Sequence, residues 1–494
     1  MSGPTNEFTP LLSNDTESAV LESTKDGDVH DIYDRFTKRT KWSILAMASA
    51  GGLLPSFVGG SFIPSIPQIA KDLDSTGAVI SMAVSISILA SSFGALSGAT
   101  YAGYYGRRPV YLYSLPLLCI GSTGVAFSRS VTSLMIWRFI QAMGCAPGQS
   151  VGAGAIGDIY RLEERGRAMS VFFSACLIGP ALAPLTGGFA AHYASWRVMQ
   201  FALGCIGMVL FVVMLRSFPE TSHPGARKVD QLKSLVDYDG VDSRNAEPKR
   251  DWRSQLPVLL NPLSPLALLR SPILASIGII TTISLFTYQV LLVPLAYTLG
   301  VRYSITNEAL IGACFIPAGV GNMIAAPIIG RISDMSVIRW KKKRNGVWYP
   351  EDRLRPALLP MITLVPLSCI ASGLLSAYGS GRVGLALNLL CLFLNGLGIE
   401  MLWGPCAAYM VDVMHARSVE CIAGNAGLRS ALLAIGVGTI LPMINSWGVV
   451  VTNTLASSMA IVGFALLCCL IRYGNELRAV VDVGFSPSGS NITP

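Results

Sequence analysis

The sequence predicts an all-α membrane protein with twelve transmembrane helices in two six-helix bundles. Apolar residues make up 52% of the 494 residues and charged residues 13%, whereas a soluble chain carries about 25% charged residues. The apolar residues also gather in runs of twenty or more, which is the pattern of membrane spans. A polar stretch in the middle of the chain separates six such runs from six others.

Each apolar run is long enough to cross a bilayer, because 20 residues at ~1.5 Å each cover ~30 Å. The runs lie at 43–66, 77–101, 109–128, 133–157, 168–190, 198–216, 272–299, 308–329, 357–378, 383–411, 421–444 and 448–471. We therefore expect an N-terminal tail (1–41), a first six-helix bundle (42–216), a central loop (217–270), a second bundle (271–471) and a C-terminal tail (472–494).

The basic residues orient the chain. The predicted outer loops carry five of the 37 lysines and arginines, two lie in spans, and the remaining thirty fall in the tails and the alternate loops. Because cytosolic loops carry the excess of Lys and Arg, both tails and the central loop are expected in the cytosol. The net charge of +8 is then mostly membrane topology, and a nucleic-acid partner is not expected.

The residue patterns that an intramembrane enzyme or a metal site needs are not found within the spans. The four histidines, at positions 30, 192, 223 and 415, all lie outside the depth of the spans, which argues against an intramembrane enzyme. Most of the eleven cysteines lie within spans, and none shows metal-ligand spacing. We expect no metal and no cofactor. The polar first forty residues contain Asp and Glu, which argues against a cleaved signal peptide.

The fourth span contains a permanent cation. Arg138 is followed by nineteen residues without a charge, until Asp158. On a helix, Arg138 and Gln149 lie about 20° apart, with Gln141 about 60° to one side, so we expect a polar face directed into a water-filled cavity. Glycines 144, 148 and 152 form a neighbouring stripe that allows a second helix to approach. The alternative is that Arg138 reaches the outer headgroups.

Polar residues also mark the second half. Glu400 is the only acidic residue deep in any span, and Asn395 lies in the same helix about 140° away. Asn425 and Arg429 lie one turn apart in span 11. Tyr288 in span 7 completes this predicted substrate and proton relay, although packing is the alternative for Tyr288. Because desolvation favours the neutral form of a carboxyl group, a buried carboxyl can carry a proton.

The two halves also match each other. ATYAGYYGRRP follows span 2 and GRISDMSVIRW follows span 8, while span 4 ends at Asp158 and span 10 ends at Asp412. A duplicated chain with six spans in each half and a cytosolic linker is typical of secondary transporters.

Four motifs resemble the major facilitator superfamily, and its fungal twelve-span drug:proton antiporter branch in particular, which includes quinidine-resistance-type and dityrosine exporters. They are GYYGRRPV, RFIQAMG, GDIYRLEERGRAMS and GPALAPLTGG, in order along the chain. The resemblance extends over about residues 40 to 475 and implies a twelve-span transporter. It also implies that Arg138 takes part in proton coupling and substrate binding.

The first motif implies a conformational latch at the cytosolic rim. Arg107 is expected to pair with Asp158 while the protein faces outward; Gly106, Arg108, Asp334 and Asp412 complete the motif and its repeat in the second half. This chain has Gly103 where the family has an Asp, and Ala99 at the first glycine position. The alternative for the two arginines is membrane anchoring alone.

The GPALAPLTGG segment implies antiporter membership and a bent span 5 packed on a neighbour. Its predicted packing residues are Gly179, Pro180, Pro184, Gly187 and Gly188, with Ala183 at a position where the family usually has Gly.

We therefore expect a monomeric, proton-coupled exporter of a small organic molecule that works by alternating access in a lipid bilayer. Two arginines and one glutamate within the spans favour an organic acid, such as the itaconate exported by fungal relatives, or another secondary metabolite. The alternatives are a polyspecific antiporter of cationic or neutral drugs, import in place of export, and a sensor on a transporter scaffold. The plasma membrane is expected, with EFTPLL at 7–12 leaving vacuolar or endosomal membranes as the alternative.

A cysteine placed at Asn245 tests the topology. We expect an impermeant thiol reagent to label it only after the cells are opened, because the central loop faces the cytosol. Labelling of this cysteine above the parent chain in intact cells would invert the predicted orientation.

Overall fold

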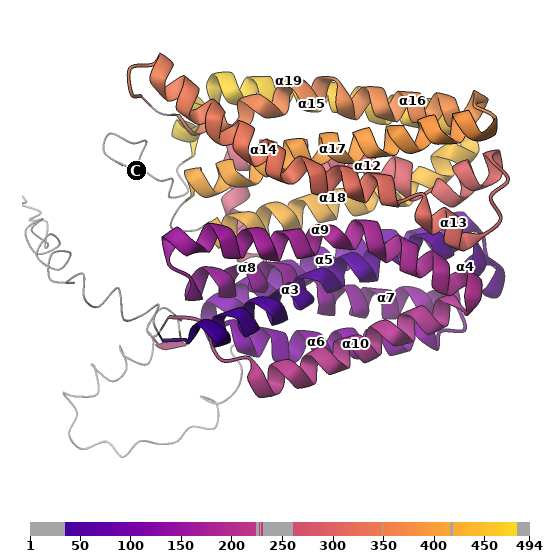
Figure 1. The fold of residues 1–494 in the computed structure, drawn as a ribbon, viewed down its shortest axis with the longest axis horizontal. Coiled ribbons are helices and arrows are strands. Elements are labelled where there is room, and N and C mark those ends of the chain that lie inside the picture. Colours follow the sequence, from indigo (N-terminus) through magenta and orange to yellow (C-terminus); the bar gives the residue numbers. More distant parts are fainter. Residues whose placement is uncertain are drawn as a thin grey trace, which may run out of the picture.

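A computed structural model describes residues 35–223, 227, 229–230, 260–347, 349–414 and 418–481. Within this range the secondary structure is helical, without strands. Most of both predicted tails and most of the central loop lie outside the described residues, and so does Asn245. The structure is a pair of helical bundles placed side by side (Figure 1).

The first bundle contains the first six spans. Its helices are α3 (Lys38–Gly60), η1 (Ile63–Ser65), α4 (Ile66–Asp72), α5 (Gly77–Tyr105), α6 (Arg107–Ala126), α7 (Val131–Cys145), α8 (Pro147–Ile159), α9 (Leu162–Tyr193) and α10 (Trp196–Ser217). We call this bundle the N half.

The second bundle, the C half, contains the other six. Its helices are η3 (Ser264–Arg270), α12 (Pro272–Leu292), the π-helical η4 (Ala296–Gly300), α13 (Glu308–Ala313), α14 (Ile316–Lys343), η5 (Pro350–Ala357), α15 (Leu358–Ile362), α16 (Leu364–Tyr378), α17 (Gly381–Val413), α18 (Ser418–Trp447) and α19 (Val449–Val480).

The described residues confirm the predicted fold class. Eleven helical stretches are long and apolar enough to cross a membrane. The remaining span consists of α7 and α8, with 15 and 13 residues. Each is short alone, but Ala146 joins them in a right-handed helical conformation.

Two spans that the sequence predicted as continuous are broken. Span 1 is interrupted at Ser61–Phe62, after Gly59 and Gly60 and before Pro64. Span 4 is interrupted at Ala146, because Pro147 has no N–H group to continue the helical ladder. Both breaks shape the site described below.

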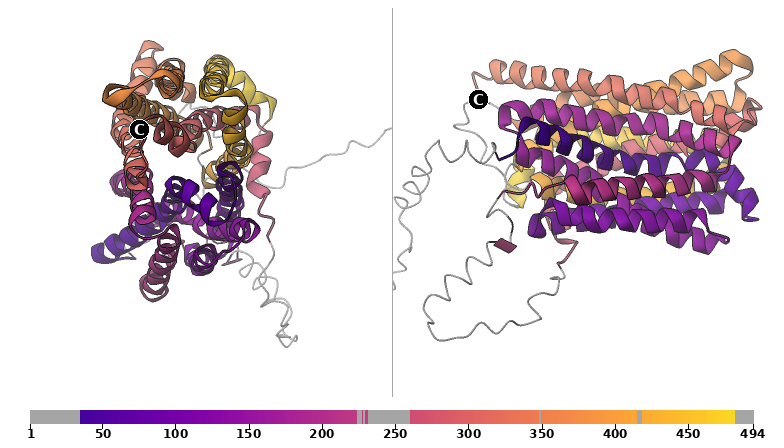
Figure 2. Two further views of the ribbon diagram at one scale, coloured as in Figure 1. Left: turned by 90° about the vertical axis from the view of Figure 1, so that its right-hand side faces the viewer. Right: turned by 60° about the horizontal axis from the view of Figure 1, so that its bottom comes forward.

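The halves meet along two pairs of helices. Helix α5 packs along α18, and α9 packs against α13 and α14. The Ser92 hydroxyl donates to the Gly427 carbonyl across the first contact at 2.8 Å. At the second contact a Cβ atom on Gly188 would lie 2.3 Å from the Glu308 carbonyl oxygen, so only glycine allows this approach. Figure 2 shows the two bundles meeting in both further views.

The apolar core shows which end is closed. One cluster of buried residues spans both halves; it includes Phe62 and Ile66 from the N half and Leu292 and Phe315 from the C half. The other two clusters each belong to one half, the second around Tyr111 and the third around Tyr409. The shared cluster lies towards α4 and α13, at the predicted outer end. The halves are therefore packed together at the outer end and have separate cores at the cytosolic end.

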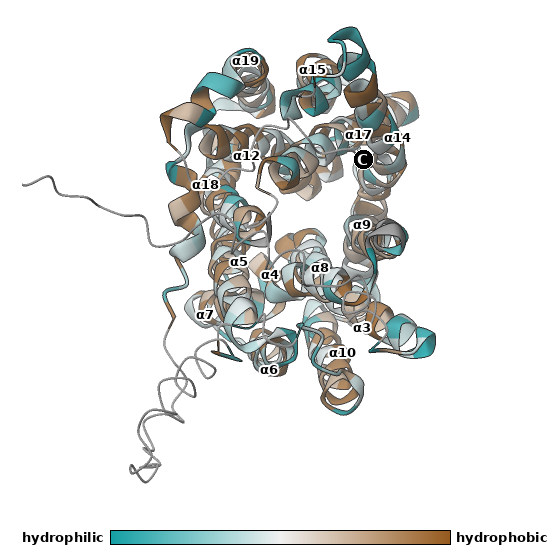
Figure 3. Cartoon of the chain, turned by 90° about the vertical axis from the view of Figure 1, so that its left-hand side faces the viewer, coloured by the Kyte–Doolittle hydropathy of each residue, from teal (hydrophilic) through white to brown (hydrophobic). Residues whose placement is uncertain are grey.

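The cytosolic end is the one viewed in Figure 3. Helices α6 and α10 lie at the periphery of the N half, and α15 and α19 lie at the periphery of the C half. Helices α5 and α18 lie side by side at one side of this view and α9 lies at the other. These helices, together with α13 and α14, carry the contacts between the halves.

Widening the outer contact tests this arrangement. In Gly188→Leu the side chain meets the Glu308 carbonyl, so we expect the outer end to open. A cysteine at Gln289, between the halves, should then react faster with an impermeant reagent added outside. Gly103→Leu is the matched control, because nothing lies within 4 Å of a Cβ there. Equal reaction rates in the two variants would contradict the outer closure.

Candidate functional site

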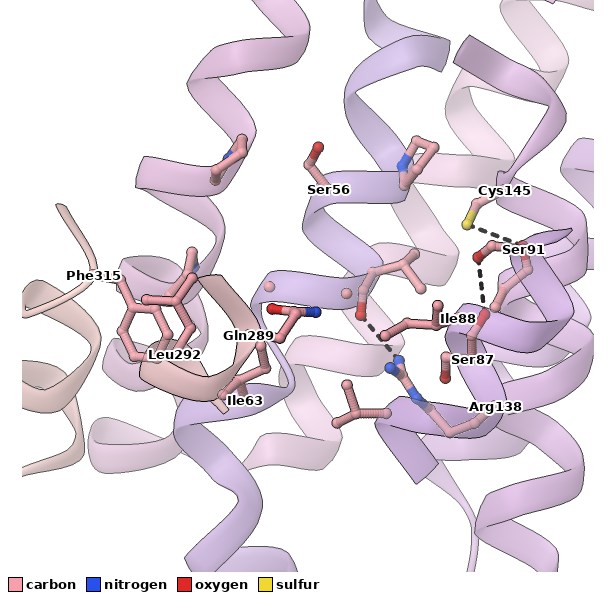
Figure 4. A pocket seen from close by; sticks show the side chains of 18 of the residues that line it. Ser56, Ile63, Ser87, Ile88, Ser91, Arg138, Cys145, Gln289, Leu292 and Phe315 are labelled. Atoms are coloured by element: carbon pink, nitrogen blue, oxygen red, sulfur yellow. Dashed lines mark hydrogen bonds between the residues drawn. The ribbon is translucent and has the colours of Figure 1, made fainter. Parts of the chain in front are cut away.

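A cavity of about 230 Å³ lies between the two halves, below the outer closure (Figure 4). Its polar lining consists of serines from α3 and α5, Arg138 from α7, and Tyr288 and Gln289 from α12. Pro55, Pro180 and Pro184 and apolar side chains, including Ile63, Leu292 and Phe315, complete the wall. Arg138 is the one charged side chain among these described lining residues.

Arg138 is fully buried, which argues against the alternative that it reaches the outer headgroups. Its Nη1 group donates to the Val58 carbonyl and to the Gln141 side-chain oxygen, both at 2.9 Å. The face of its guanidinium group covers the Phe62 ring, 4.2 Å from the ring centre. Within the described residues, Nε and Nη2 have no hydrogen-bond partner.

The break in span 1 creates two of these contacts. Val58 lies in the last turn of α3, where carbonyl groups lose their regular helical donors. Phe62 follows that end directly. A continuous helix would occupy the Val58 carbonyl and direct Phe62 along the helix surface. The sequence signal was the run GGSFIP at 59–64, which is typical of a helix end.

Gln141 holds the Arg138 side chain in place through its own hydrogen bonds. Its amide nitrogen donates to Ser122 of α6 and to Gln200 of α10, each at 2.9 Å. Gln141 is buried and does not line the cavity, so its geometric role is to hold Arg138 rather than to face the cavity.

Gln149 does not join this network. It is exposed, although the helical repeat predicted that it would share a face with Arg138. Gln149 lies in α8, after the interruption at Ala146 and Pro147, whereas Arg138 lies in α7. The glycines are divided between the same two segments. A Cβ on Gly144 would meet Leu118, one on Gly148 would meet Gly51, and one on Gly152 would meet Phe172. The stripe therefore packs against three helices.

Tyr288 belongs to the wall of the cavity that the C half contributes. Its hydroxyl oxygen accepts a hydrogen bond from the Asn322 amide nitrogen at 3.2 Å. The carboxyl group of Glu400 lies within electrostatic range of this hydroxyl group, but Glu400 does not line the cavity itself. Asn322 and Gln289 were not among the residues singled out from the sequence.

Asn395 lies elsewhere. Its amide donates to Ser368 at 3.0 Å and to the Val365 carbonyl at 3.3 Å, so it joins α17 to α16. Asn395 thus points towards α16, in agreement with the helical phase that placed it about 140° from Glu400.

Arg429 and Asn425 form a separate group on α18. The Arg429 guanidinium group covers the Trp403 ring, 4.2 Å from the ring centre. Neither polar atom of the buried Asn425 side chain has a partner in the described residues. Both residues lie apart from the lining of the cavity.

Arg107 and Asp158 form an ion pair at 3.0 Å. The first motif implied this pair for the outward-facing form, but here it is present while the outer end is packed shut, so the pairing is not confined to the outward-facing form. Glu220, at the end of span 6, accepts hydrogen bonds from the backbone N–H groups of Arg107 and Arg108 at 2.9 and 3.1 Å. Gly106 has a φ of +104°, and a Cβ there would lie 2.5 Å from the Glu220 carboxyl. Glu220 thus supplies a carboxylate at this loop, while Gly103 is exposed; the sequence reasoning missed Glu220.

The C half has a corresponding cluster. Arg353 pairs with Asp412 at 2.6 Å and with Asp334 at 2.8 Å. The arginine comes from η5, inside the polar insert after span 8, and was not singled out from the sequence. Both clusters join residues of one half, so neither ion pair by itself holds the two halves together.

Through the GPALAPLTGG segment, α9 packs against span 1 of its own half and against α13 of the other half. A Cβ on Gly179 would lie 2.3 Å from the Ser56 side chain, and one on Gly187 would lie 2.1 Å from the Ser61 carbonyl. Gly188 approaches α13 of the other half. Pro180 and Pro184 lie between them and line the cavity.

Among the described residues, no group of three or more His, Cys, Asp or Glu side chains is placed to hold a metal ion.

Known proteins are similar to this chain in sequence and in fold. The chain is 27% identical to the efflux pump radE of Floropilus chiversii, over 89% of this chain and 81% of the relative. It is 27% identical to the MFS-type transporter oryF of Aspergillus oryzae, over 97% and 98% of the two chains. It is 22% identical to the MFS antiporter QDR3 of Candida albicans, over 91% and 80%.

The xylose transporter XylE of E. coli has the same fold, with a TM-score of 0.60 at 14% identity, over 88% of this chain and 99% of that one. The sequence pattern of the Major Facilitator Superfamily matches residues 48–439. With twelve spans in two halves, a cavity between them and this match, the chain belongs to the Major Facilitator Superfamily and is a secondary transporter and not an enzyme.

Proposed function

We propose that this transporter exports a small organic acid in exchange for protons. The observation that carries the proposal is the free edge of Arg138. Nε and Nη2 have no partner in the described residues, and Arg138 is the one charged side chain on the lining of the cavity. A guanidinium edge of this kind matches the two oxygens of a carboxylate.

The size of the cavity favours a small substrate. Its volume of about 230 Å³ is below the range of ~300–1,000 Å³ that is usual for drug-sized ligands. The apolar and proline-rich wall suits the carbon skeleton of an organic acid, and Gln289 and Tyr288 offer polar contacts opposite the arginine.

Alternating access would bring the substrate to Arg138 from the cytosol. The outer end is packed shut by the core that both halves share, while the cytosolic ends have separate cores. This arrangement supports cytosolic loading, which is the first step of export. The Arg107–Asp158 and Arg353–Asp412 pairs would keep each half rigid as the halves rock. When the cytosolic end closes, the loop that contains one pair would approach the loop that contains the other.

Glu400 is the proposed proton carrier. A carboxyl group can take up and release a proton, whereas an arginine stays charged at any accessible pH. Glu400 lies near Tyr288, which lines the cavity, so its charge can act on the wall opposite Arg138.

The relatives support export and antiport. The radE protein is named an efflux pump, and QDR3 is named an antiporter. The second candidate is a polyspecific drug:proton antiporter, which the acidic Glu400 on the C-half side favours. Plasma membrane location and a monomeric state complete the proposal.

Transport into inside-out vesicles separates the two candidates. Itaconate, citrate and benzoate should accumulate in the vesicles, and their rate of uptake should rise when a proton gradient is imposed. Cationic drugs should not accumulate. Accumulation of the cationic drugs alone would favour the second candidate.

Replacing Arg138 by Lys keeps the positive charge and removes the planar fork. Loss of one charged hydrogen bond of ~1.5–3 kcal/mol should raise the half-saturating anion concentration about tenfold or more, with expression unchanged. The exposed Arg382, changed to Lys, is the control. An unchanged half-saturation would remove Arg138 from substrate binding.

Replacing Glu400 by Gln should preserve folding and exchange of substrate for substrate, and should abolish acceleration by the proton gradient, because the amide does not titrate. The exposed Glu476, changed to Gln, is the matched control. Retention of the wild-type pH profile by the Glu400 variant would move the coupling role to Asp158, Asp334, Asp412 or the substrate itself.

A further inference from the structure

A second cation lies deep in the other half, without an acidic partner in the part of the chain that the structure describes. Arg429 of α18 stacks on the Trp403 ring of α17, 4.2 Å from its centre. Within the described residues, no carboxylate lies within ion-pair distance of Arg429. Its charge is therefore uncompensated inside the membrane span, although such charges are expensive there and usually serve function.

The groups around Arg429 also lack partners. The indole Nε1 of Trp403 is buried without a hydrogen-bond acceptor in the described chain. Asn425, one helical turn before Arg429, is 1% exposed, and neither its Oδ1 nor its Nδ2 has a partner there. Most buried polar groups in proteins are satisfied. Three neighbouring side chains with free polar groups therefore point to a ligand that supplies their partners.

These free groups are mostly donors. Stacking uses the face of a guanidinium group and leaves the N–H groups in its plane available. The Trp403 indole and the Asn425 amide add further N–H donors without partners in the described residues. The combination suits the oxygens of an anion, and a carboxylate fits the planar guanidinium edge.

The face of α17 that carries Trp403 lies opposite the exposed apolar stripe of this helix. Val383, Leu387 and Leu390 form its exposed apolar stripe. At ~100° per residue, Glu400, Trp403 and Ala407 lie on the side opposite Leu387. Ala407, one turn after Trp403, is exposed, so a reagent can reach this side of α17 beside Trp403.

The two arginines lie at different depths. Arg138 is ~10 Å along α7 from its outer end, and Arg429 is ~16 Å along α18 from its cytosolic end, at ~1.5 Å per residue. Each has an aromatic ring on one face at 4.2 Å. The cations thus lie one in each half, with Arg429 closer to the cytosolic entrance.

We propose that Arg429, Trp403 and Asn425 form an anion-binding subsite that receives the carboxylate of the substrate from the cytosol before Arg138 does. The inference rests on the proposed function, because it takes the substrate to be an organic anion. Glu400 lies one turn before Trp403 on α17 and within electrostatic range of Tyr288 on the cavity wall, so its negative charge would act on the anion as the anion moves towards Arg138.

Protection of a cysteine tests binding without transport. In Ala407→Cys, benzoate should slow alkylation of residue 407 by a maleimide, measured by mass spectrometry on the purified full-length protein, and the uncharged benzamide should not. Adding Arg429→Gln should remove the protection, while the exposed Arg472, changed to Gln, should leave it. Equal alkylation rates with and without benzoate would overturn the subsite.

Two further variants separate binding from folding. Trp403→Phe keeps a ring beneath the guanidinium group and removes only the indole N–H, so it should fold and bind benzoate more weakly. In inside-out vesicles, Arg429→Gln should raise the half-saturating itaconate concentration about tenfold, the loss of a charged hydrogen bond. In right-side-out vesicles the half-saturation at the outer face should stay within about twofold.

The outcomes distinguish the subsite from the proposed function. If wild-type vesicles do not accumulate itaconate or benzoate but benzoate still protects residue 407, the subsite stands and the proposed export of acids fails. If anions are transported and both Arg429→Gln and Trp403→Phe leave the cytosolic half-saturation unchanged, the subsite is wrong and the proposed function stands. An equal rise of the half-saturating itaconate concentration at both membrane faces in Arg429→Gln would overturn the proposed order of binding.

Discussion

A guanidinium charge that stays protonated must be held inside a membrane span, and much of the N half is arranged around it. Placing such a charge at the centre of a bilayer costs ~3 kcal/mol on insertion scales and more in simulations. Arg138 offsets this cost with the Val58 carbonyl, the Gln141 amide and the Phe62 ring. Two of these three contacts exist because α3 ends at Gly60, within span 1, so the interruption of a helix supports the charge.

The same contacts explain why part of the arginine remains free. Nη1 is occupied by two acceptors and one face is occupied by Phe62, which fixes the orientation of the group. The Nε and Nη2 donors on the opposite edge have no partner in the described residues, and the Arg138 side chain lines the cavity. A site whose donors are already oriented loses little conformational entropy when it binds. In the other half Arg429 lies over the Trp403 ring, and among the described residues it has no hydrogen-bonded acceptor, so more of its donors are free.

The small residues at the contacts between the halves matter for the transport cycle. Gly188 and Gly312 let α9 and α13 approach closely at the outer end, and the serines of α5 donate to carbonyl groups of α18. Contacts between small side chains and backbone atoms depend on van der Waals packing, which needs no deeply interlocked side chains. Two rigid halves with such contacts can rock on one another, while the ion pairs within each half keep its cytosolic loops in place.

The sequence predicted the fold class and the ends of most spans, since hydropathy and charge bias follow directly from the membrane. It also placed the Arg107–Asp158 pair and separated Asn395 from Glu400 by helical phase. It did not predict the breaks in spans 1 and 4, so Gln149 was expected beside Arg138 and lies apart from it. Glu220 and Arg353 were missed because their partners are distant in sequence, and Phe62 because its role depends on where α3 ends.

The most direct test of the central claim is an experimental structure of the transporter with benzoate or itaconate bound. A carboxylate that binds the free edge of Arg138 should place its two oxygens about 2.8 Å from Nε and Nη2, the usual length for charged N–H···O contacts. The contacts from Val58, Gln141 and Phe62 should be unchanged. A ligand bound between the halves with both donors of Arg138 still unoccupied would contradict the account.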